Sequence, residues 1–288
     1  MKIRIAGALC AAGAVASLSA QATTAPTRLV AGLPDGGQHE NRTIRSGPDG
    51  LLYVSVGSSC NDCAESNQLE RGTIIRYTPL GQRVDVFAKG LRNTIGFDWQ
   101  PVTGELWGMD NGSDGHGDDI PPEELNRIEP GRHYGWPNCF GPQIVDIRTN
   151  DGPEQQALRP GETEPIGRPI GKDEFCALTA PSVLTYAAHA APLDLRFYDA
   201  DQFAGYRGDA FVVFRGSWNR RTPIGYGVAR LRFRGGLPSG FEPFLTGFLS
   251  EERDSYVGRP AGLAVTRDGS LLVSDDTNGV IYRVSYGS

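Results

Sequence analysis

The sequence predicts an all-β fold of the β-propeller class, and two observations lead to this prediction. The 288 residues include 38 glycines and 20 prolines, a composition that favours many short elements joined by tight turns over long helices. In addition, a unit made of a turn and an alternating or apolar strand recurs along the chain. Its four copies are PDGLLYVSVGS (48–58), VTGELWGMDNG (102–112), YRGDAFVVFRGS (206–217) and TRDGSLLVSDDTNG (266–279).

Two further strand types complete the repeat. The second type follows three of the copies, at GTIIRY (72–77), GVARLRF (227–233) and GVIYRVSY (279–286), and the third type occurs at RVDVFAKGL (83–91) and FEPFLTGFL (241–249). Repeats of about 50 residues that contain several strands are typical of propeller blades. We recognise about four blades, with a long, poorly periodic loop at 135–182. The alternative is a β-sandwich whose segments are alike by chance.

The first 22 residues have the layout of a secretory signal peptide. Lys2 and Arg4 precede an apolar stretch that ends in Ala20-Gln21-Ala22, so we expect cleavage before Thr23 and a single domain over residues 23–288. A membrane span is not expected, since no later run of about 18 apolar residues follows. The segment TRLVAGL (27–33) resembles the strand type that the last repeat lacks. It either closes the propeller against the last blade or is the end of a preceding blade.

Four cysteines remain once the signal peptide is removed, and an even number in an exported chain predicts disulfides. Three pairings are possible, and we favour Cys60–Cys63 as a local bridge and Cys139–Cys176 as a clip across the long loop. A c-type haem is not predicted because the residue after the second Cys of the CxxC is not His. A zinc site would need more ligand pairs than this single CxxC offers.

The net charge of −6 gives a nucleic-acid-binding role no electrostatic support. No Gly-rich phosphate loop follows a predicted strand, so NAD or FAD is not expected either.

The segment MDNGSDGHGDDIPPEELN (109–126) holds six carboxylates among glycines and prolines, which predicts neither a strand nor a long helix there. Read as a calcium-binding EF-hand loop from Asp110, it places Asp114 and Gly115 correctly at the fifth and sixth positions. Pro121 then occupies the twelfth position, where a bidentate Glu is required. The spacing therefore excludes an EF-hand.

The stretch GLRNTIGFDWQPVTGELWGMDNGSDGHGDDIPPEELNRIEPGRHYGWPNC (90–139) resembles the glucose/sorbosone dehydrogenase family, most closely its sorbosone-dehydrogenase-like branch. The resemblance continues through QHENRTIRSGPDGLLYVSVGSSCNDC upstream and through RFYDADQF, GSWNR, GRPAGLAV and GSLLVSDD downstream. It implies a periplasmic or secreted six-bladed propeller that uses pyrroloquinoline quinone and calcium. The chain departs from the family pattern because its signal peptide runs almost directly into a middle blade.

The resemblance implies catalytic roles for two residues. His39 in QHENRT matches the general base, and a neutral imidazole suits removal of a sugar hydroxyl proton as hydride leaves carbon. Arg92 in GLRN matches the arginine beside the reacting carbonyl of the quinone, where a guanidinium stabilises growing negative charge. Asn93 lies against the cofactor with it.

Further residues match cofactor contacts. Arg259 in GRPAGLAV and Arg220 (or Asn219) in GSWNR match cations for the cofactor carboxylates. Ala261 stands where the glucose-oxidising branch has a second arginine. His189 either faces the site or packs in the core, and we favour the core; His116 and His133 are expected in loops.

The resemblance also implies two calcium sites made of hard oxygen ligands. The backbone carbonyls of Gly112 and Ser113 match the calcium that bridges to the cofactor, and Glu124 with the carbonyl of Tyr134 matches a structural calcium. No role is expected for three other carboxylates of the segment, namely Asp114, Asp118 and Asp119.

Together these features imply a quinoprotein that oxidises an aldose or sugar aldehyde and passes electrons to an external acceptor. A homo-oligomer is compatible with this function. Two alternatives remain at the level of sequence. One is a non-catalytic, truncated propeller that binds carbohydrate or a protein partner. The other is a calcium-dependent, lactonase-like propeller with side-chain metal ligands in its channel.

Overall fold

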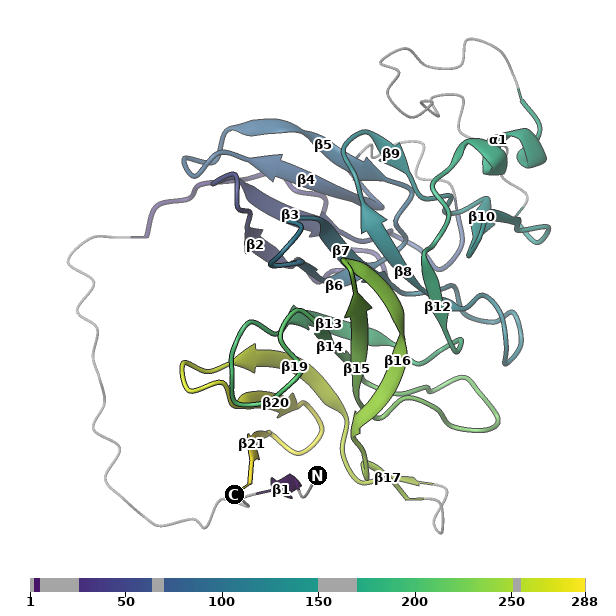
Figure 1. Ribbon diagram of the computed structural model, residues 1–288. Helices are drawn as coiled ribbons and strands as arrows, with labels where there is room; N and C mark the ends of the chain where they lie inside the picture. Colours follow the sequence, from purple (N-terminus) through teal and green to yellow (C-terminus); the bar gives the residue numbers. More distant parts are fainter. Residues whose placement is uncertain (1–2, 6–25, 64–69, 150–169, 251–254, 288) are drawn as a thin grey trace.

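The protein is an all-β molecule built from successive antiparallel sheets (Figure 1). Its computed structural model describes residues 3–5, 26–63, 70–149, 170–250 and 255–287. Within these ranges the chain forms four larger sheets, of four or five strands each, and two two-stranded sheets. The β-sandwich alternative, which requires two facing sheets, does not fit this arrangement.

The first sheet is formed by the N-terminal half of the chain, and the second sheet adds a strand from beyond it. The first sheet has the order β2-β3-β4-β5-β9, and its strands are β2 (Ile44–Ser46), β3 (Leu52–Val56), β4 (Thr73–Tyr77), β5 (Arg83–Lys89) and the short parallel β9 (Arg132–His133). The second sheet has the order β6-β7-β8-β12, and its strands are β6 (Thr94–Trp99), β7 (Leu106–Asp110), β8 (Glu123–Ile128) and β12 (Leu184–Tyr186).

The third and fourth sheets follow in chain order. The third consists of β13 (Pro192–Phe197), β14 (Ala210–Phe214), β15 (Gly227–Arg234) and β16 (Leu237–Leu245). The fourth consists of β19 (Pro260–Val265), β20 (Leu271–Asp275), β21 (Val280–Tyr286) and β1 (Ile3–Ile5), in that order. The two small sheets are β10 (Cys139–Phe140) with β11 (Ile144–Val145), and β17 (Leu249–Ser250) with β18 (Ser255–Tyr256). One helix, α1 (Lys172–Leu178), belongs to the described ranges.

The hydrophobic core consists of layers between successive sheets, and β14 shows why. Successive side chains of a strand point to opposite faces, so a strand between two layers must be apolar at every position. Phe211 and Val213 join the layer shared with the fourth sheet, whereas Val212 and Phe214 join the layer shared with the second. All five residues of β14 are accordingly buried. A third layer lies between the first and second sheets, around Ile74, Phe87, Phe97 and Leu106.

The first strands of the sheets approach one another closely. A Cβ on Gly96 of β6 would lie 2.5 Å from the carbonyl carbon of Asp194 in β13, so only glycine allows this contact between the two strands. The Asp194 carboxylate accepts a hydrogen bond from Arg45 of β2 at 2.9 Å and from the backbone N–H of Leu263 of β19 at 3.1 Å. Asp194 thereby joins the first, third and fourth sheets.

The outer face of the first sheet is covered by the segment before it. Val30 and Leu33 pack on a cluster formed by Val54, Val56, Ile75 and Tyr77. The prediction that residues 27–33 close the propeller is wrong, because the described residues of this segment form no strand and β21 pairs with β1 instead. That the segment ends a preceding blade stays a prediction. Of the predicted signal peptide, residues 1–22, the structure describes only β1. Signal peptide cleavage therefore stays a prediction.

Most of the strands predicted from the repeats are confirmed, as β3, β4, β5, β7, β14, β15, β16, β20 and β21. The prediction of no strand in 109–126 is wrong at both ends, since Met109 and Asp110 end β7 and residues 123–126 begin β8. The glycines and prolines that led to it are confined to the loop between these strands. The loop at 135–182 contains β10, β11 and α1, with residues 150–169 outside the described ranges.

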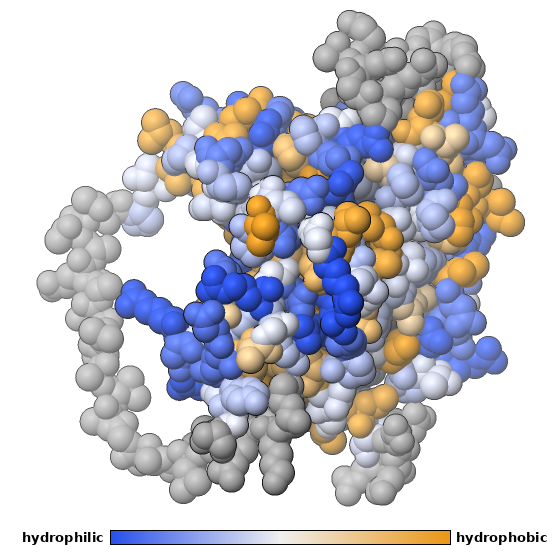
Figure 2. Space-filling view, in the orientation of Figure 1, coloured by the Kyte–Doolittle hydropathy of each residue, from blue (hydrophilic) through white to orange (hydrophobic). Residues whose placement is uncertain are grey.

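Both favoured disulfides are confirmed. Cys60 pairs with Cys63 and Cys139 with Cys176, with Cα atoms 6.1 and 5.8 Å apart. On the face shown in Figure 2, apolar residues lie in small groups among polar ones. None of the described helices has the length and apolar character needed to cross a bilayer.

Candidate functional site

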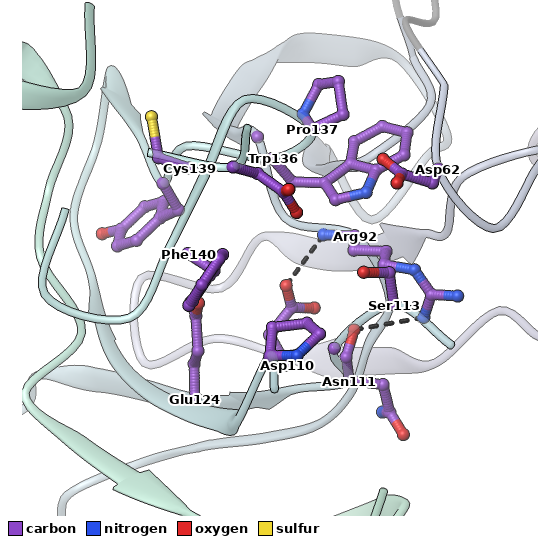
Figure 3. A pocket seen from close by; sticks show the side chains of 15 residues that line it. Asp62, Arg92, Asp110, Asn111, Ser113, Glu124, Trp136, Pro137, Cys139 and Phe140 are labelled. Carbon is purple, nitrogen blue, oxygen red and sulfur yellow. Dashed lines mark hydrogen bonds between the residues drawn. The ribbon is translucent and has the colours of Figure 1, made fainter. Parts of the chain in front are cut away.

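A pocket lies where β7 ends and β8 begins (Figure 3). Asp110 and Glu124 approach it from these two strands, while Trp136, Pro137 and Cys139 lie on the opposite side. Its other lining residues are Asp62, Gly90, Arg92, Asn111, Gly112, Ser113, Pro121, Tyr134, Phe140 and Asp146. The sequence therefore brings together five predicted site residues in one pocket: Arg92, Gly112, Ser113, Glu124 and Tyr134.

Asp110 is buried at the end of β7 and organises the segment after β5. Its carboxylate accepts hydrogen bonds from the backbone N–H groups of Arg92 and Asn93 and from the Thr94 hydroxyl, each at 2.8 Å. Burial raises the pKa of Asp110, and these three donors act in the opposite direction. Asp110 therefore fixes the backbone from which Arg92 and Asn93 project.

Glu123 and Glu124 are adjacent in β8, and both are buried because this strand has covered faces on both sides. Glu123 accepts hydrogen bonds from the backbone N–H groups of Gly112 and Ala191, both at 2.9 Å. Glu124 accepts one from the N–H of Gly141 at 2.6 Å and one from the Asn126 amide at 3.2 Å. Burial raises the pKa of Glu123 to about 7 and that of Glu124 to about 8.

Arg92 is the cation among the pocket's lining residues, and it is 3% exposed. Its guanidinium donates to the carbonyl and side-chain oxygens of Asn61 at 2.8 Å and to the carbonyl of Asn111 at 3.2 Å. Asp114 lies 3.7 Å away. Burial lowers the pKa of Arg92, while the surrounding carboxylates raise it. The side chain is thus held in one orientation by groups other than the buried carboxylates.

His39 lies against the same backbone as Arg92. Ser58 donates its N–H to the carbonyl of Arg92 at 2.8 Å, and a Cβ on Gly57 would lie 2.6 Å from His39 Cβ and 2.7 Å from Asn93 Oδ1. His39 and Asn93 therefore meet over Gly57, where only glycine leaves room. The structure thus brings together His39, Arg92 and Asn93.

The hydrogen bonds of His39 define its tautomer. Its Nδ1 lies 3.0 Å from the Ser58 carbonyl and 2.8 Å from the Ser58 hydroxyl, which itself donates to the Cys60 carbonyl. Nδ1 must then carry the proton, which leaves the lone pair of the neutral ring on Nε2. Burial, and secondly the charge of Arg92, lower the pKa of His39 to about 4. The imidazole is therefore neutral at physiological pH.

Arg220 and Arg259 do not line this pocket. Arg220 donates to the Asp118 carbonyl at 2.5 Å and pairs with Asp119 at 3.1 Å. Arg259 donates to the Gly216 carbonyl at 2.6 Å, and its guanidinium lies over the rings of Tyr226 and Tyr256. Their cofactor contacts stay predictions. Ala261 is partly buried in β19, close to Arg259 in the chain.

The loop carboxylates for which no role was expected do have one. Asp114 accepts a hydrogen bond from the Asn219 amide at 2.6 Å, and Asp118 pairs with Arg221 at 2.8 Å. With the contacts of Arg220, they connect the loop after β7 to the loop after β14.

The structure also tests what was expected of His189 and His133. His189 is buried and its Nε2 lies 2.7 Å from the Gly117 carbonyl, as the core alternative predicts. His133 lies in β9, buried with its ring against Phe175, so the expectation that it lies in a loop is wrong. Asp110 and Glu123 were missed as site residues, although both belong to the acidic segment 109–126.

The fold and pocket together define an all-β, propeller-like protein whose site gathers buried carboxylates around one arginine. A family model described as TrAA12-like matches residues 16–287, and the chain belongs to this family. This confirms the resemblance to quinone-dependent sugar dehydrogenases seen in the sequence.

Individual proteins and solved structures are also similar to this chain. An uncharacterised protein of Borreliella burgdorferi is 33% identical over 253 residues, which cover 86% of this chain and 61% of that protein. The pyrroloquinoline quinone-dependent pyranose dehydrogenase of Coprinopsis cinerea is 26% identical over 299 residues, which cover 85% of this chain and 39% of that protein. A calcium structure of a Trichoderma reesei carbohydrate-active enzyme of family AA12 has a TM-score of 0.69 at 23% identity and shares the fold over 90% of this chain and 71% of that chain. The chain thus spans 61% and 39% of the lengths of the two curated relatives named here.

Proposed function

We propose that this protein is a pyrroloquinoline quinone-dependent sugar dehydrogenase, a single β-propeller domain over residues 23–288 that works in the periplasm or outside the cell. The four larger sheets act as its blades, and an aldose or sugar aldehyde is the substrate. The observation that carries the proposal is that His39 and Asn93 meet over Gly57 beside Arg92, whose carbonyl binds the neighbouring Ser58 N–H. Membership of a family with sugar-dehydrogenase relatives supports it.

The chemistry of the pocket fits calcium. Asp110, Glu123 and Glu124 are buried carboxylates with raised pKa values, and Arg92 is the lining cation that partly offsets them. Carboxylates and backbone carbonyls are the hard oxygen ligands that calcium prefers. We assign the carbonyls of Gly112 and Ser113 to a calcium shared with the cofactor. Glu124 and the carbonyl of Tyr134 are assigned to a structural calcium.

The residues around Gly57 fit a quinone that carries carboxylates. Arg92 is held by Asn61 and Asn111 before any ligand binds, so little side-chain entropy is lost when it contacts an anion. Asn93 projects from the same fixed backbone. Arg259 and Arg220 are assigned to the cofactor carboxylates, as the sequence implies. When bound, the quinone supplies the hydride acceptor, and an external acceptor later removes the electrons.

His39 is the proposed base, acting through the lone pair on Nε2. Its pKa of about 4 makes it a weak base, because the partly buried ring and the nearby Arg92 both disfavour an imidazolium. Proton transfer from the sugar hydroxyl is therefore coupled to hydride departure, when the hydroxyl becomes most acidic. Arg92 stabilises the negative charge that the hydride brings to the site.

The test is to add calcium and pyrroloquinoline quinone to purified protein, then record the absorbance change of the cofactor and dye reduction with a panel of aldoses. We expect cofactor binding and turnover with at least one sugar. The variant His39→Ala should bind the cofactor with unchanged affinity and lose at least about 100-fold in kcat. A variant with full activity would contradict the assignment of His39.

Other outcomes of this test would favour one of the two alternative functions. Binding without turnover on any aldose would favour the non-catalytic propeller that binds carbohydrate or a protein partner. Calcium-dependent lactone hydrolysis without the quinone would favour the lactonase-like propeller. Sedimentation of the purified chain tests whether it is a homo-oligomer.

A further inference from the structure

Asp62, His116 and Asp146 form a cluster at the point where three loops that border the pocket meet. Asp62 lies within the Cys60–Cys63 disulfide loop, and His116 belongs to the loop between β7 and β8. Asp146 follows β11, in the segment closed by the Cys139–Cys176 disulfide. Asp62 and Asp146 both line the pocket, and Figure 3 shows Asp62 at its rim beside Trp136. None of these three residues has a part in the proposed sugar oxidation.

The geometry of the cluster suits a metal ion. One ligand atom from each residue lies within 4.8 Å of the other two, and His116 Nε2 is 3.1 Å from Asp62 Oδ2. Two ligands bound to one ion at about 2.1 Å lie roughly 3.0–3.4 Å apart, so this pair already has the spacing of neighbouring ligands. Nε2 is buried, yet within the described ranges it makes no hydrogen bond of good geometry.

The charges of the cluster also favour a bound cation. The carboxylates of Asp62 and Asp146 face each other, and burial, followed by the charge of Asp146, raises the pKa of Asp62. Arg148 contacts both oxygens of Asp146 at 2.9 Å, which offsets one of the two negative charges. Asp146 Oδ1 also accepts the backbone N–H of Arg148 at 3.0 Å, so Oδ2 is the oxygen of this carboxylate that keeps a further lone pair. A divalent cation would offset the second charge and give the buried Nε2 a partner.

We propose that Asp62, His116 and Asp146 bind a divalent transition metal of the zinc or cobalt class. One imidazole and two carboxylates form a mixed nitrogen and oxygen donor set, which suits such ions, whereas calcium takes oxygen ligands. The cluster is thus chemically distinct from the all-oxygen calcium sites assigned above. The bound ion links the three loops and so fixes the wall of the pocket.

The test uses the full chain with both disulfides intact, without an affinity tag, after treatment with a chelator. Zinc is titrated by calorimetry, and cobalt binding is followed by its visible absorption bands. We expect one equivalent of either ion to bind and to raise the unfolding temperature. Asp62→Asn and His116→Ala should each weaken binding by at least about 10-fold. Asp118→Asn, which removes a carboxylate of the same loop outside the cluster, should bind like the parent.

The proposal is overturned if the parent binds neither ion, or if both cluster variants bind as tightly as the parent. It is also overturned if calcium displaces cobalt at equal concentration, because the donor set would then not discriminate. Unfolding curves without metal check that the variants fold, and the nearly isosteric Asp62→Asn carries the test if His116→Ala does not fold. None of these measurements uses the quinone or a sugar, so failure of the proposed function would leave this result unchanged.

Discussion

Two sets of carboxylates, only a few residues apart in the chain, have different partners. Asp110, Glu123 and Glu124 lie in strands, are buried, and are bound mainly by backbone N–H groups. Asp114, Asp118 and Asp119 lie in the connecting loop and are bound by side chains of the loop after β14. Burial raises the pKa of all three strand carboxylates, while pairing with Arg221 lowers the pKa of Asp118.

The difference shows that the number of acids in a segment does not define a site. A backbone N–H carries no full charge, so it does not compensate the charge of a buried carboxylate; in chelator a proton does so, which raises the pKa, and a cation can take the place of that proton. A carboxylate paired with arginine is already compensated. The strand set is therefore suited to metal binding, whereas the loop set connects two segments. Four measurements test this contrast, beginning with the largest expected effect.

Asp110→Ala should destabilise the protein most. The change leaves the N–H groups of Arg92 and Asn93 and the Thr94 hydroxyl without their acceptor in a buried site, at a cost of about 3–5 kcal/mol. Chemical denaturation at neutral pH with chelator measures the free energy of unfolding. A loss below about 1 kcal/mol would show that Asp110 does not organise this backbone.

Glu124→Gln should change how stability depends on pH. Because the folded pKa of Glu124 is about 8, above its ordinary value of 4.5, the folded state binds the extra proton between these pH values. In chelator, stability therefore falls as pH rises from 4.5 through 8, by up to about 1.4 kcal/mol per pH unit. The variant should lack this part of the slope, and calcium should raise its unfolding temperature less than that of the parent, because only the calcium assigned to Glu124 and the Tyr134 carbonyl is lost. An unchanged slope would contradict the raised pKa.

Asp114→Ala should have a smaller effect, about 1 kcal/mol, because the carboxylate is about one third exposed. The loss of the Asn219 contact frees the loop after β7 from the loop after β14. Proteolysis of the native protein should become faster at residues 113–119, with Asn219→Ala giving the same pattern. Protection equal to that of the parent would show that this contact does not hold the loop.

Asp118→Ala should have the smallest effect. Its partner Arg221 is 91% exposed, and ion pairs with so exposed a side chain are screened by water and salt. The unfolding temperature should stay within the error of the parent. A clear decrease would place Asp118 with the strand set and remove the contrast between the two.

Most of the second and third strands of the sheets, together with β5 and β16, could be predicted from the sequence because they have apolar or alternating patterns between recognisable turns. The first strands, such as β6 and β13, were not predicted. They contribute Phe97 and Leu195 to the core, but close backbone contacts with a neighbouring sheet, such as Gly96 against Asp194, interrupt their apolar pattern. β8 was missed because Pro121 and Pro122 precede it immediately.

The site could be predicted in part. His39, Arg92 and Asn93 were expected together from the family resemblance. In the structure His39 and Asn93 meet over Gly57, and the carbonyl of Arg92 binds the adjacent Ser58 N–H. The position of Arg220 could not be predicted, because its partners Asp118 and Asp119 are about 100 residues away in the chain. Long-range pairs of this kind leave no local pattern.

The position of Asp194 has a consequence for the order of folding during synthesis. Arg45 emerges from the ribosome 149 residues before its partner, and Leu263 emerges 69 residues after it. Closing so long a loop costs entropy that only later contacts recover. All strands of the first two sheets precede residue 194 in the chain, but Arg45 acquires its partner only after β13, the first strand of the third sheet, has been synthesised.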